Sequence, residues 1–135
     1  MADTFHLEIV TPEKMLVKDD AEEMQIPGKS GYLGILPGHA PLITELGVGE
    51  MTYRKGGETH RFVVARGFAE VLPDRVTILA ENADRPQEID VNKARAGKQR
   101  AEEHMSKGQS EEDFTRAEAE MRLADTQLEV AGKRN

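Results

Sequence analysis

Residues 31–43 read GYLGILPGHAPLI, and this segment decides how the fold is interpreted. Three glycines and two prolines interrupt its apolar residues, so it is too broken for a helix and too apolar for a solvated linker. Glycine and proline at this density turn the backbone sharply, because glycine reaches positive φ and proline holds φ at a value that turns use. We therefore predict a sharp connection between strands, anchored to a core by its apolar residues. The segment carries no obvious catalytic group.

The chain around this segment, from residue 4 to residue 82, has the pattern of short β-strands. Apolar and polar residues alternate over residues 5–9, as they do in a strand with one buried face. Gly56–Gly57 precedes the apolar run 62–65, and Pro73–Asp74 separates two further apolar runs, so each pair predicts a hairpin. Many short strands with frequent turns are typical of a β-sandwich or a barrel.

The pattern changes near Pro86, and residues 90–135 contain no proline. Asp90 is suited to N-cap a helix, and Gly108 is suited to the C′ position after it. Ser110 begins a second helix, with an acidic residue three positions later as in a weak capping box. Because helices joined by a few residues run antiparallel, we predict an α+β chain: an N-terminal β-sandwich followed by a C-terminal antiparallel α-helical hairpin.

The second predicted helix has an apolar seam at alternating steps of three and four residues. Its members are Phe114, Ala117, Met121, Ala124, Leu128 and Ala131. The first helix has a matching stripe that Lys98 interrupts, formed by Val91, Ala94, Ala101 and Met105. Alanine lets the helices approach closely but buries little area, so we predict a hairpin that is marginal alone and detaches easily.

Basic residues crowd the opening of the first helix, at Lys93, Arg95, Lys98 and Arg100. This arrangement opposes the helix dipole, which favours acidic residues at the N-terminus. A solvated face is the plainer interpretation. A site for an anion or an acidic partner is the alternative.

Composition excludes several classes of protein. The net charge of −7 argues against nonspecific nucleic-acid binding, and the absence of cysteine excludes disulfides, thiolate metal sites and a cysteine nucleophile. The N-terminal residues lack the pattern of a signal peptide. No apolar stretch approaches the roughly 20 residues that span a bilayer, so we expect no direct membrane insertion.

No constellation predicts catalysis. Gly28-Lys29-Ser30 resembles the end of a P-loop, but Glu23 stands where that motif needs glycine, and no helix is predicted after Ser30. The four histidines are scattered, with no metal-ligand spacing, and we expect His6 and His60 on exposed strand faces. We therefore predict no catalytic residue and no metal site. A small β-sandwich enzyme stays only as a third hypothesis.

The segment SGYLGILPGHAPLI resembles S-G-E-L-G-I-L-P-G-H-A-P-L, which is found in the epsilon subunit of F-type ATP synthases. The resemblance covers nearly the whole chain, including VTPEK at 10–14, the KGG turn, Arg66-Gly67-Phe68, VTILA at 76–80, Ile89-Asp90-Val91 and RAEEH at 100–104. The chain is thus identified as a member of this family, of the bacterial type. The resemblance implies a β-sandwich of about ten strands and a helical hairpin.

The resemblance also implies a role and partners. It assigns residues 1–86 to a sandwich domain that binds the gamma subunit and the c-subunit ring, and residues 87–135 to a regulatory hairpin. Such a subunit has no active site. It couples proton-driven rotation to ATP synthesis in the central stalk, and its helices extend toward the alpha and beta subunits to inhibit ATP hydrolysis. We expect a peripheral protein at the cytoplasmic face of the bacterial plasma membrane.

Some relatives hold ATP between the folded helices, and this nucleotide-sensing role is the second hypothesis. The resemblance carries an ATP site onto Asp90, Lys93 and Arg100, although Lys93 replaces an arginine of the motif. Lysine cannot repeat the planar fork of arginine. Leu123 and Gln127 replace two further arginines, so we expect weak ATP binding at best, and no resident cofactor.

The resemblance marks partner contacts at Gly31, Tyr32 and His39. Many members have glutamate where this chain has Tyr32, placed against the c ring, so Tyr32 either contacts that partner without charge or covers local apolar surface. His39 either contacts a partner or braces its loop. Arg116 and Arg122 on the second helix are the residues expected to contact the catalytic subunits when the hairpin extends.

Overall fold

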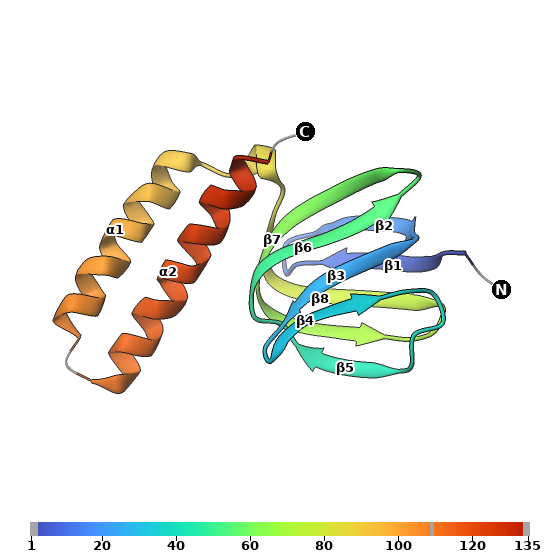
Figure 1. Cartoon of the computed structure of the whole chain (residues 1–135), viewed down its shortest axis with the longest axis horizontal. Helices are drawn as coiled ribbons and strands as arrows, with labels where there is room; N and C mark the ends of the chain where they lie inside the picture. Colours follow the sequence, from blue (N-terminus) through green and yellow to red (C-terminus); the bar gives the residue numbers. More distant parts are fainter. Residues whose placement is uncertain (1–2, 109, 134–135) are drawn as a thin grey trace.

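A computed structural model describes residues 3–108 and 110–133 of the chain (Figure 1). Within these residues it contains eight strands, one 3₁₀ turn and two helices. The strands are β1 Phe5–Val10, β2 Met15–Ala21, β3 Glu23–Gly28, β4 Gly31–Ile35, β5 Leu42–Glu45, β6 Val48–Lys55, β7 Glu58–Val71 and β8 Arg75–Asp84. The turn η1 covers Pro86–Glu88, and the helices are α1 Val91–Lys107 and α2 Glu111–Ala131. The α+β class with a sandwich and a helical hairpin is confirmed.

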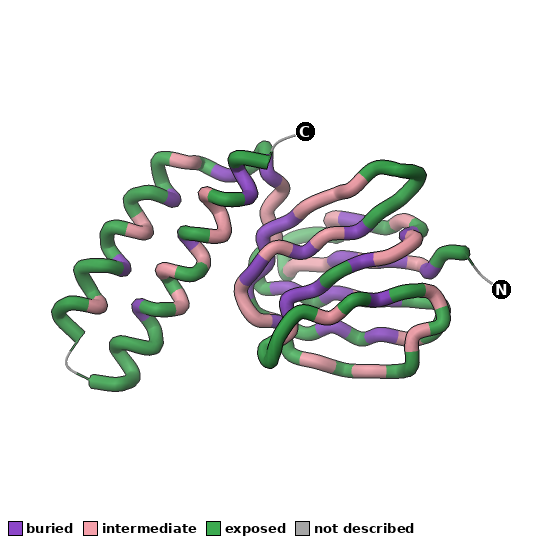
Figure 2. Tube along the Cα trace, viewed as in Figure 1, coloured by how far each residue is buried: buried purple, intermediate pink, exposed green. Residues whose placement is uncertain are grey.

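The strands follow the order β2-β1-β8-β7-β6-β3-β4, and β5 also pairs with β7. All pairs are antiparallel except β1 with β8, which is parallel. The core lies inside the folded sheet, where the alternation predicted for residues 5–9 buries Phe5, Leu7 and Ile9. Figure 2 shows a similar alternation along β6, whereas β7 buries four consecutive residues at 62–65.

Both predicted hairpins are present. Lys55 pairs with Glu58 across Gly56–Gly57, and the two glycines have φ of 58° and 83°, as two-residue hairpin turns require. Across Pro73–Asp74, the amide of Leu72 donates to the carbonyl of Arg75 at 2.7 Å. The glycine and proline residues of these two turns therefore predicted both hairpins correctly.

The strand number is eight in the described residues, not about ten. The main reason is β7, which runs unbroken for 14 residues and joins the run at 62–65 to the run before Pro73. It bends at Arg66 and Gly67, whose φ values are 57° and 126°. A Cβ at Gly67 would lie 2.0 Å from the carbonyl oxygen of Leu79, so only glycine fits where β7 bends against its neighbour β8.

The segment 31–43 connects strands as predicted. It supplies β4, a loop at 36–41 and the start of β5. Ile35 is buried, and Leu33 and Leu42 pack against the core. The loop is tied to the second hairpin, because the amide of Gly38 donates to the carbonyl of Pro73 at 2.7 Å.

The predicted caps of the helices are confirmed at their N-termini. The carboxylate of Asp90 accepts from the amide of Lys93 at 3.1 Å, and the Ser110 hydroxyl accepts from the amide of Asp113 at 3.0 Å. The prediction for Gly108 was wrong, because this residue has φ of −61° and no left-handed C′ conformation. The chain leaves α1 in extended form toward the next N-cap, so it needs no reversal at Gly108.

The two helices pack through their small residues. Ala94 and Ala101 of α1 and Ala117 and Ala124 of α2 are buried, whereas Phe114 at the far end of the seam stays 44% exposed. Lys98, which interrupts the stripe of α1, pairs with Asp125 of α2 at 2.9 Å. Figure 1 shows α2 between α1 and the sandwich, so α2 makes most of the contact with the strands, and Val91 at the start of α1 adds to it.

Candidate functional site

The junction between α2 and the sandwich holds a small apolar cluster of its own. Val63 points outward from β7 and meets Ile89 beside η1 and Val130 near the end of α2. All three are buried, as is Ala131, and Leu123 packs against them. This cluster is separate from the sandwich core, so the hairpin is held by a compact apolar contact near one end of α2.

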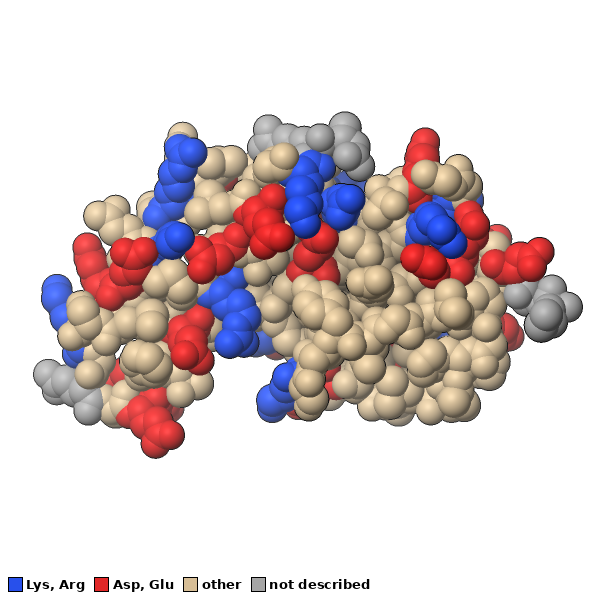
Figure 3. Space-filling model, viewed as in Figure 1, with Lys and Arg blue, Asp and Glu red and all other residues tan. Residues whose placement is uncertain are grey.

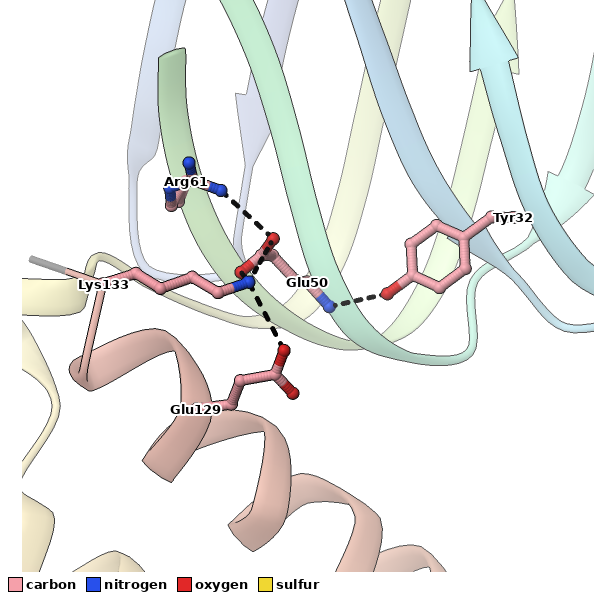
Figure 4. Close-up of polar contacts among 5 residues, drawn as sticks. All are labelled: Tyr32, Glu50, Arg61, Glu129 and Lys133. Atoms are coloured by element: carbon pink, nitrogen blue, oxygen red, sulfur yellow. Dashed lines mark hydrogen bonds and ion pairs between the residues drawn. The ribbon is translucent and has the colours of Figure 1, made fainter.

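A polar network lies beside this cluster, on the β6 side of Val63 (Figure 4). Glu50 of β6 lies at its centre. Its Oε1 is 3.3 Å from Nη1 of Arg61 on β7, and its Oε2 is 3.2 Å from Nζ of Lys133 after α2. Lys133 also pairs with Glu129 at 3.3 Å. The hydrogen bond to Glu50 raises the pKa of Lys133 above its ordinary value. The network therefore links the end of α2 to two strands.

Tyr32 joins the same network from β4. The Tyr32 hydroxyl accepts a hydrogen bond from the backbone amide of Glu50 at 3.0 Å. Strand β3 does not pair with Glu50, because the pairing of β3 with β6 ends at Gln25. Tyr32 pairs with Pro27 of β3, and its hydroxyl and the Pro27 side chain both lie against Gly49. A Cβ at Gly49 would lie 2.6 Å from the Tyr32 hydroxyl, so glycine makes room for this contact. Tyr32 is still 59% exposed, and covers local surface while it faces solvent.

Asp84 occupies the other side of the junction. It ends β8, and its side chain is hydrogen-bonded to Gln127 of α2. Burial raises the pKa of the Asp84 carboxyl, the nearby charge of Glu88 raises it further, and the hydrogen bond from Gln127 opposes both effects. A half-buried carboxyl therefore lies where the hairpin meets the sheet.

The residues predicted for ATP binding are only partly brought together. The Asp90 carboxylate is engaged as a helix cap, and Lys93 lies exposed in the first turn of α1. Arg100 is exposed seven residues further on, roughly 10 Å along the helix axis. Leu123 and Gln127 face the junction instead, in the apolar cluster and on Asp84.

The other predicted site residues occupy three separate places. Gly31 is exposed, with φ of 136°, beside Tyr32 at the start of β4, whereas His39 lies beyond the other end of that strand. His39 donates from Nδ1 to the carbonyl of Ala40 at 2.7 Å, which braces its loop. Arg116 and Arg122 are exposed on α2, and pair with glutamates one turn earlier at 3.8 and 3.9 Å.

An apolar row on the outer face of the sheet escaped the sequence analysis. Strand pairing places Phe68 of β7 beside Leu79 of β8, Leu79 beside Val10 of β1, and Val10 beside Met15 of β2. Phe68, Leu79 and Met15 are 52%, 53% and 48% exposed. Alternation along each strand contained the signal, but only the register between distant strands brings these residues into one row.

The prediction for His60 was wrong, because its ring is half-buried and stacks on Tyr53 with 4.7 Å between centroids. His6 is partly exposed and pairs with Glu8 at 3.2 Å. Among residues 3–108 and 110–133, no group of histidine and carboxylate side chains is arranged to hold a metal ion. No helix in the same residues is long and apolar enough to cross a membrane.

Comparison with known families defines the class of protein first. The family described as the ATP synthase delta/epsilon chain, beta-sandwich domain, matches residues 4–86. The long alpha-helix domain of the same delta/epsilon chains matches residues 87–132. The two matches adjoin at the start of η1, so nearly the whole described fold is accounted for by one kind of ATP synthase subunit.

Individual relatives narrow this class. An ATP synthase epsilon chain from Koribacter versatilis is 68% identical over 105 residues, which are 78% of this chain and 74% of the relative. Epsilon chains from Syntrophobacter fumaroxidans and Halalkalibacterium halodurans are each 43% identical, over 98% and 96% of this chain and 99% and 98% of theirs. The chain belongs to the ATP synthase delta/epsilon family, as an epsilon chain of the bacterial type.

Solved structures share the fold. A chain in the mitochondrial ATP synthase of Euglena gracilis, in an assembly of OSCP, F1 and c-ring, superposes with a TM-score of 0.83 at 20% identity, covering 99% of this chain and 84% of that one. A chain from the central stalk and c-ring of the Tetrahymena thermophila enzyme gives 0.68 at 12% identity, covering 94% and 96%. These likenesses concern the fold.

Proposed function

We propose that this epsilon chain is a non-catalytic subunit of the central rotor stalk that couples proton-driven rotation to ATP synthesis and restrains ATP hydrolysis through its two helices. The observation that carries the regulatory part is the small junction of α2. Its apolar contact is the cluster of Val63, Ile89, Val130 and Ala131, rimmed by the Glu50 network. An element held by so little can leave the sandwich.

The energies favour a two-state element. Burying a valine or leucine side chain contributes about 1.5–3 kcal/mol, and a surface ion pair contributes about 0–1 kcal/mol. A few such contacts, opposed by the ordering of side chains, leave a net docking energy of a few kcal/mol, which differential binding to partners can overcome. The docked hairpin is then the non-inhibitory state, and the extended hairpin inhibits.

Extension would present α2 to the alpha and beta subunits. Arg116 and Arg122 are suited to contacts there, because their exposed partners on the same helix stabilise by only about 0.3–0.5 kcal/mol each. Carboxylates on a partner can replace these glutamates with little loss. The alanines that now pack α2 against α1 would become free for contact with neighbouring helices.

The outer apolar row is the proposed contact with the gamma subunit. Phe68 and Leu79 are neighbours across β7 and β8, and Val10 of β1 connects Leu79 to Met15. A contiguous exposed apolar patch of this kind is typical of a protein interface. Exposed Ile43 on β5 and Leu36 in the loop that carries His39 extend the apolar surface. Figure 3 shows few charged side chains over β4 and β5, in contrast to the hairpin.

The corner at Gly31 and Tyr32 is the proposed contact with the c-subunit ring. It lies at the opposite end of β4 from His39, so the two partner surfaces need not overlap. Tyr32 contributes an exposed ring rather than a carboxylate. In this arrangement the chain works as a peripheral subunit at the cytoplasmic face of the bacterial plasma membrane.

Nucleotide sensing is the weaker candidate. Leu123 packs in the apolar junction, and Gln127 is engaged with Asp84, so neither position offers a cation to a triphosphate. Asp90, Lys93 and Arg100 alone would form a sparse site. Calorimetric titration of the chain with ATP is expected to give weak binding at most, and micromolar affinity with closure of the hairpin would reverse this order of candidates.

Truncation after residue 88 tests the regulatory role. In the assembled synthase, the truncated chain is expected to assemble and to raise ATP hydrolysis. A complementary experiment holds the hairpin docked: Glu50→Cys and Lys133→Cys, joined by a short bismaleimide, are expected to raise hydrolysis in the same way, since the chain has no native cysteine. Each single cysteine variant, treated identically, is the control. Hydrolysis unchanged by truncation and by the link would refute the inhibitory role.

A further inference from the structure

A hollow of about 570 Å³ lies between the start of β7 and the turn that leads into η1. His60 and Arg61 line it from β7, and Arg85 lines it from the other side. Gly57 and Gln87 complete its polar wall, and Glu58 is the one acidic side chain among its lining residues. Three basic residues therefore line one hollow in a chain whose net charge is −7.

Two of these basic groups are held in place by aromatic rings. The guanidinium of Arg85 lies over the ring of Phe62, 4.9 Å from its centroid, and donates to the carbonyl of Leu16 at 3.0 Å. The ring of His60 stacks on Tyr53 with an angle of 19° between planes. Side chains fixed in this way lose little entropy when they bind a ligand.

The basic groups also retain donors that the described residues do not use. Arg61 reaches Glu50 only through Nη1, at 3.3 Å, and its Nε is buried without a hydrogen-bond partner in the described part of the chain. A guanidinium offers five donors, and Arg85 has one side-chain hydrogen bond, to Leu16.

The acids near these basic residues are exposed or already engaged. Asp19, whose charge interacts with His60, is paired with Lys55. Glu58 lies 3.7 Å from His60 Nε2, but its side chain is 79% exposed and free to turn into solvent. Glu50 shares its charge between Arg61 and Lys133. Glu88 accepts from the backbone amide of Arg85 at 2.9 Å, which leaves the Arg85 guanidinium available.

We propose that this hollow binds a phosphate-type anion, either free phosphate or the phosphoryl end of a nucleotide, between Arg61 and Arg85 with His60 beside it. Paired guanidinium groups match the oxygen geometry of phosphate through charge-assisted hydrogen bonds. The site is distinct from Asp90, Lys93 and Arg100 on α1. Because Arg85 begins the connection to η1, a bound anion ties β7 to the segment that enters the hairpin.

The test is an NMR titration of the ¹⁵N-labelled full chain with sodium phosphate, at constant ionic strength against sodium chloride. We expect saturable shifts at the Gly57 and Gln87 amides and at the Arg85 Nε–H. Arg85→Gln is expected to weaken binding about tenfold, the loss of one charge-assisted contact. Because Arg85 also packs on Phe62, His60→Gln serves as a second variant, with a smaller loss.

Arg66→Gln is the matched control, since Arg66 pairs with Glu81 outside the hollow and its loss should leave the affinity unchanged. A parallel titration with ATP separates the two sources: tighter binding with shifts at the same amides indicates a nucleotide, and equal or weaker binding indicates free phosphate. Shifts that do not saturate, or that chloride reproduces, would overturn the proposal. So would an equal loss in Arg66→Gln and His60→Gln. None of these readouts depends on ATP hydrolysis by the synthase.

Discussion

Val130→Ala is the substitution that tests most directly how the hairpin is held. Val130 is fully buried in the junction cluster, where it meets Val63 and Ile89. The substitution removes two methyl groups and leaves the charges of the Glu50 network in place. It therefore weakens the apolar part of the docking contact and little else.

The magnitude follows from the buried carbon atoms. Two methyl groups at about 0.8 kcal/mol each contribute about 1.6 kcal/mol, and the cavity left behind raises the loss to about 2 kcal/mol. Since about 1.4 kcal/mol corresponds to a factor of ten in an equilibrium constant, the undocked population should rise about 25-fold. If docking is favoured by only a few kcal/mol, both the docked and the undocked state of the hairpin should then be measurably populated.

Hydrogen exchange of the backbone amides is the assay, because undocking exposes α2 and the outer face of β7 around Val63 without unfolding the sandwich core. We expect faster exchange throughout α1 and α2, with unchanged exchange in β1 and β7. The matched control is Val10→Ala, which removes the same two methyl groups from the outer face of β1. That variant should leave the helices unchanged.

Two outcomes of the exchange experiment would contradict this prediction. If Val130→Ala left exchange in α1 and α2 as it is in the parent chain, the apolar cluster would not be what holds the hairpin. Equal acceleration by Val10→Ala would show a general loss of stability rather than a local one. In the assembled synthase, Val130→Ala should lower ATP hydrolysis, because it favours the extended state.

Three further substitutions follow from the geometry. Tyr32→Phe leaves the amide of Glu50 without its hydroxyl acceptor and should lower the free energy of unfolding by about 1 kcal/mol in urea titrations, with no effect if water replaces the hydroxyl fully. Gly67→Ala should cost about 3 kcal/mol or more, because φ is 126° and the new Cβ would strike the Leu79 carbonyl; Gly34→Ala, with open space around it, is the control, and equal losses would contradict the argument. Asp84→Asn should flatten part of the pH dependence of stability. Burial raises the folded pKa of Asp84, so the folded state binds the proton more tightly, and this contribution is fully present below the ordinary value of 3.8 and is lost as pH rises through the folded pKa. Urea titrations of both chains across that window measure the difference, and parallel pH profiles would argue against a raised pKa.

The local elements were predictable from the sequence because their causes are local. Gly56–Gly57 predicts a hairpin because glycine can take the positive φ that both residues have. Asp90 and Ser110 predict N-caps because each side chain accepts from an amide three residues later. The exceptions also have local causes. Gly108 needed no left-handed conformation, and the bend at Gly67 lets one strand contain two apolar runs that were assigned to separate hairpins.

The candidate site was less accessible from the sequence. Tyr32 was singled out for a missing charge, yet its hydroxyl contact with Glu50 joins residues eighteen positions apart across an intervening strand. Leu123 and Gln127 were noted as losses of arginine, whereas the structure gives them partners at the junction. The outer apolar row was missed, because strand register decides which exposed residues become neighbours.

Periodicity and the conformational preferences of glycine, proline and capping residues act within a few positions, so the sequence was enough to predict the succession of strands and helices, both hairpin turns and the two N-terminal caps. The fold brings Val63 against Val130 and places Phe68, Leu79 and Met15 in one row. It also puts Arg61 and Arg85 around one hollow, and the sequence predicted none of these groupings. The physical reason is that these contacts depend on the pairing of strands far apart in the chain, which sets the face and neighbours of every side chain at once.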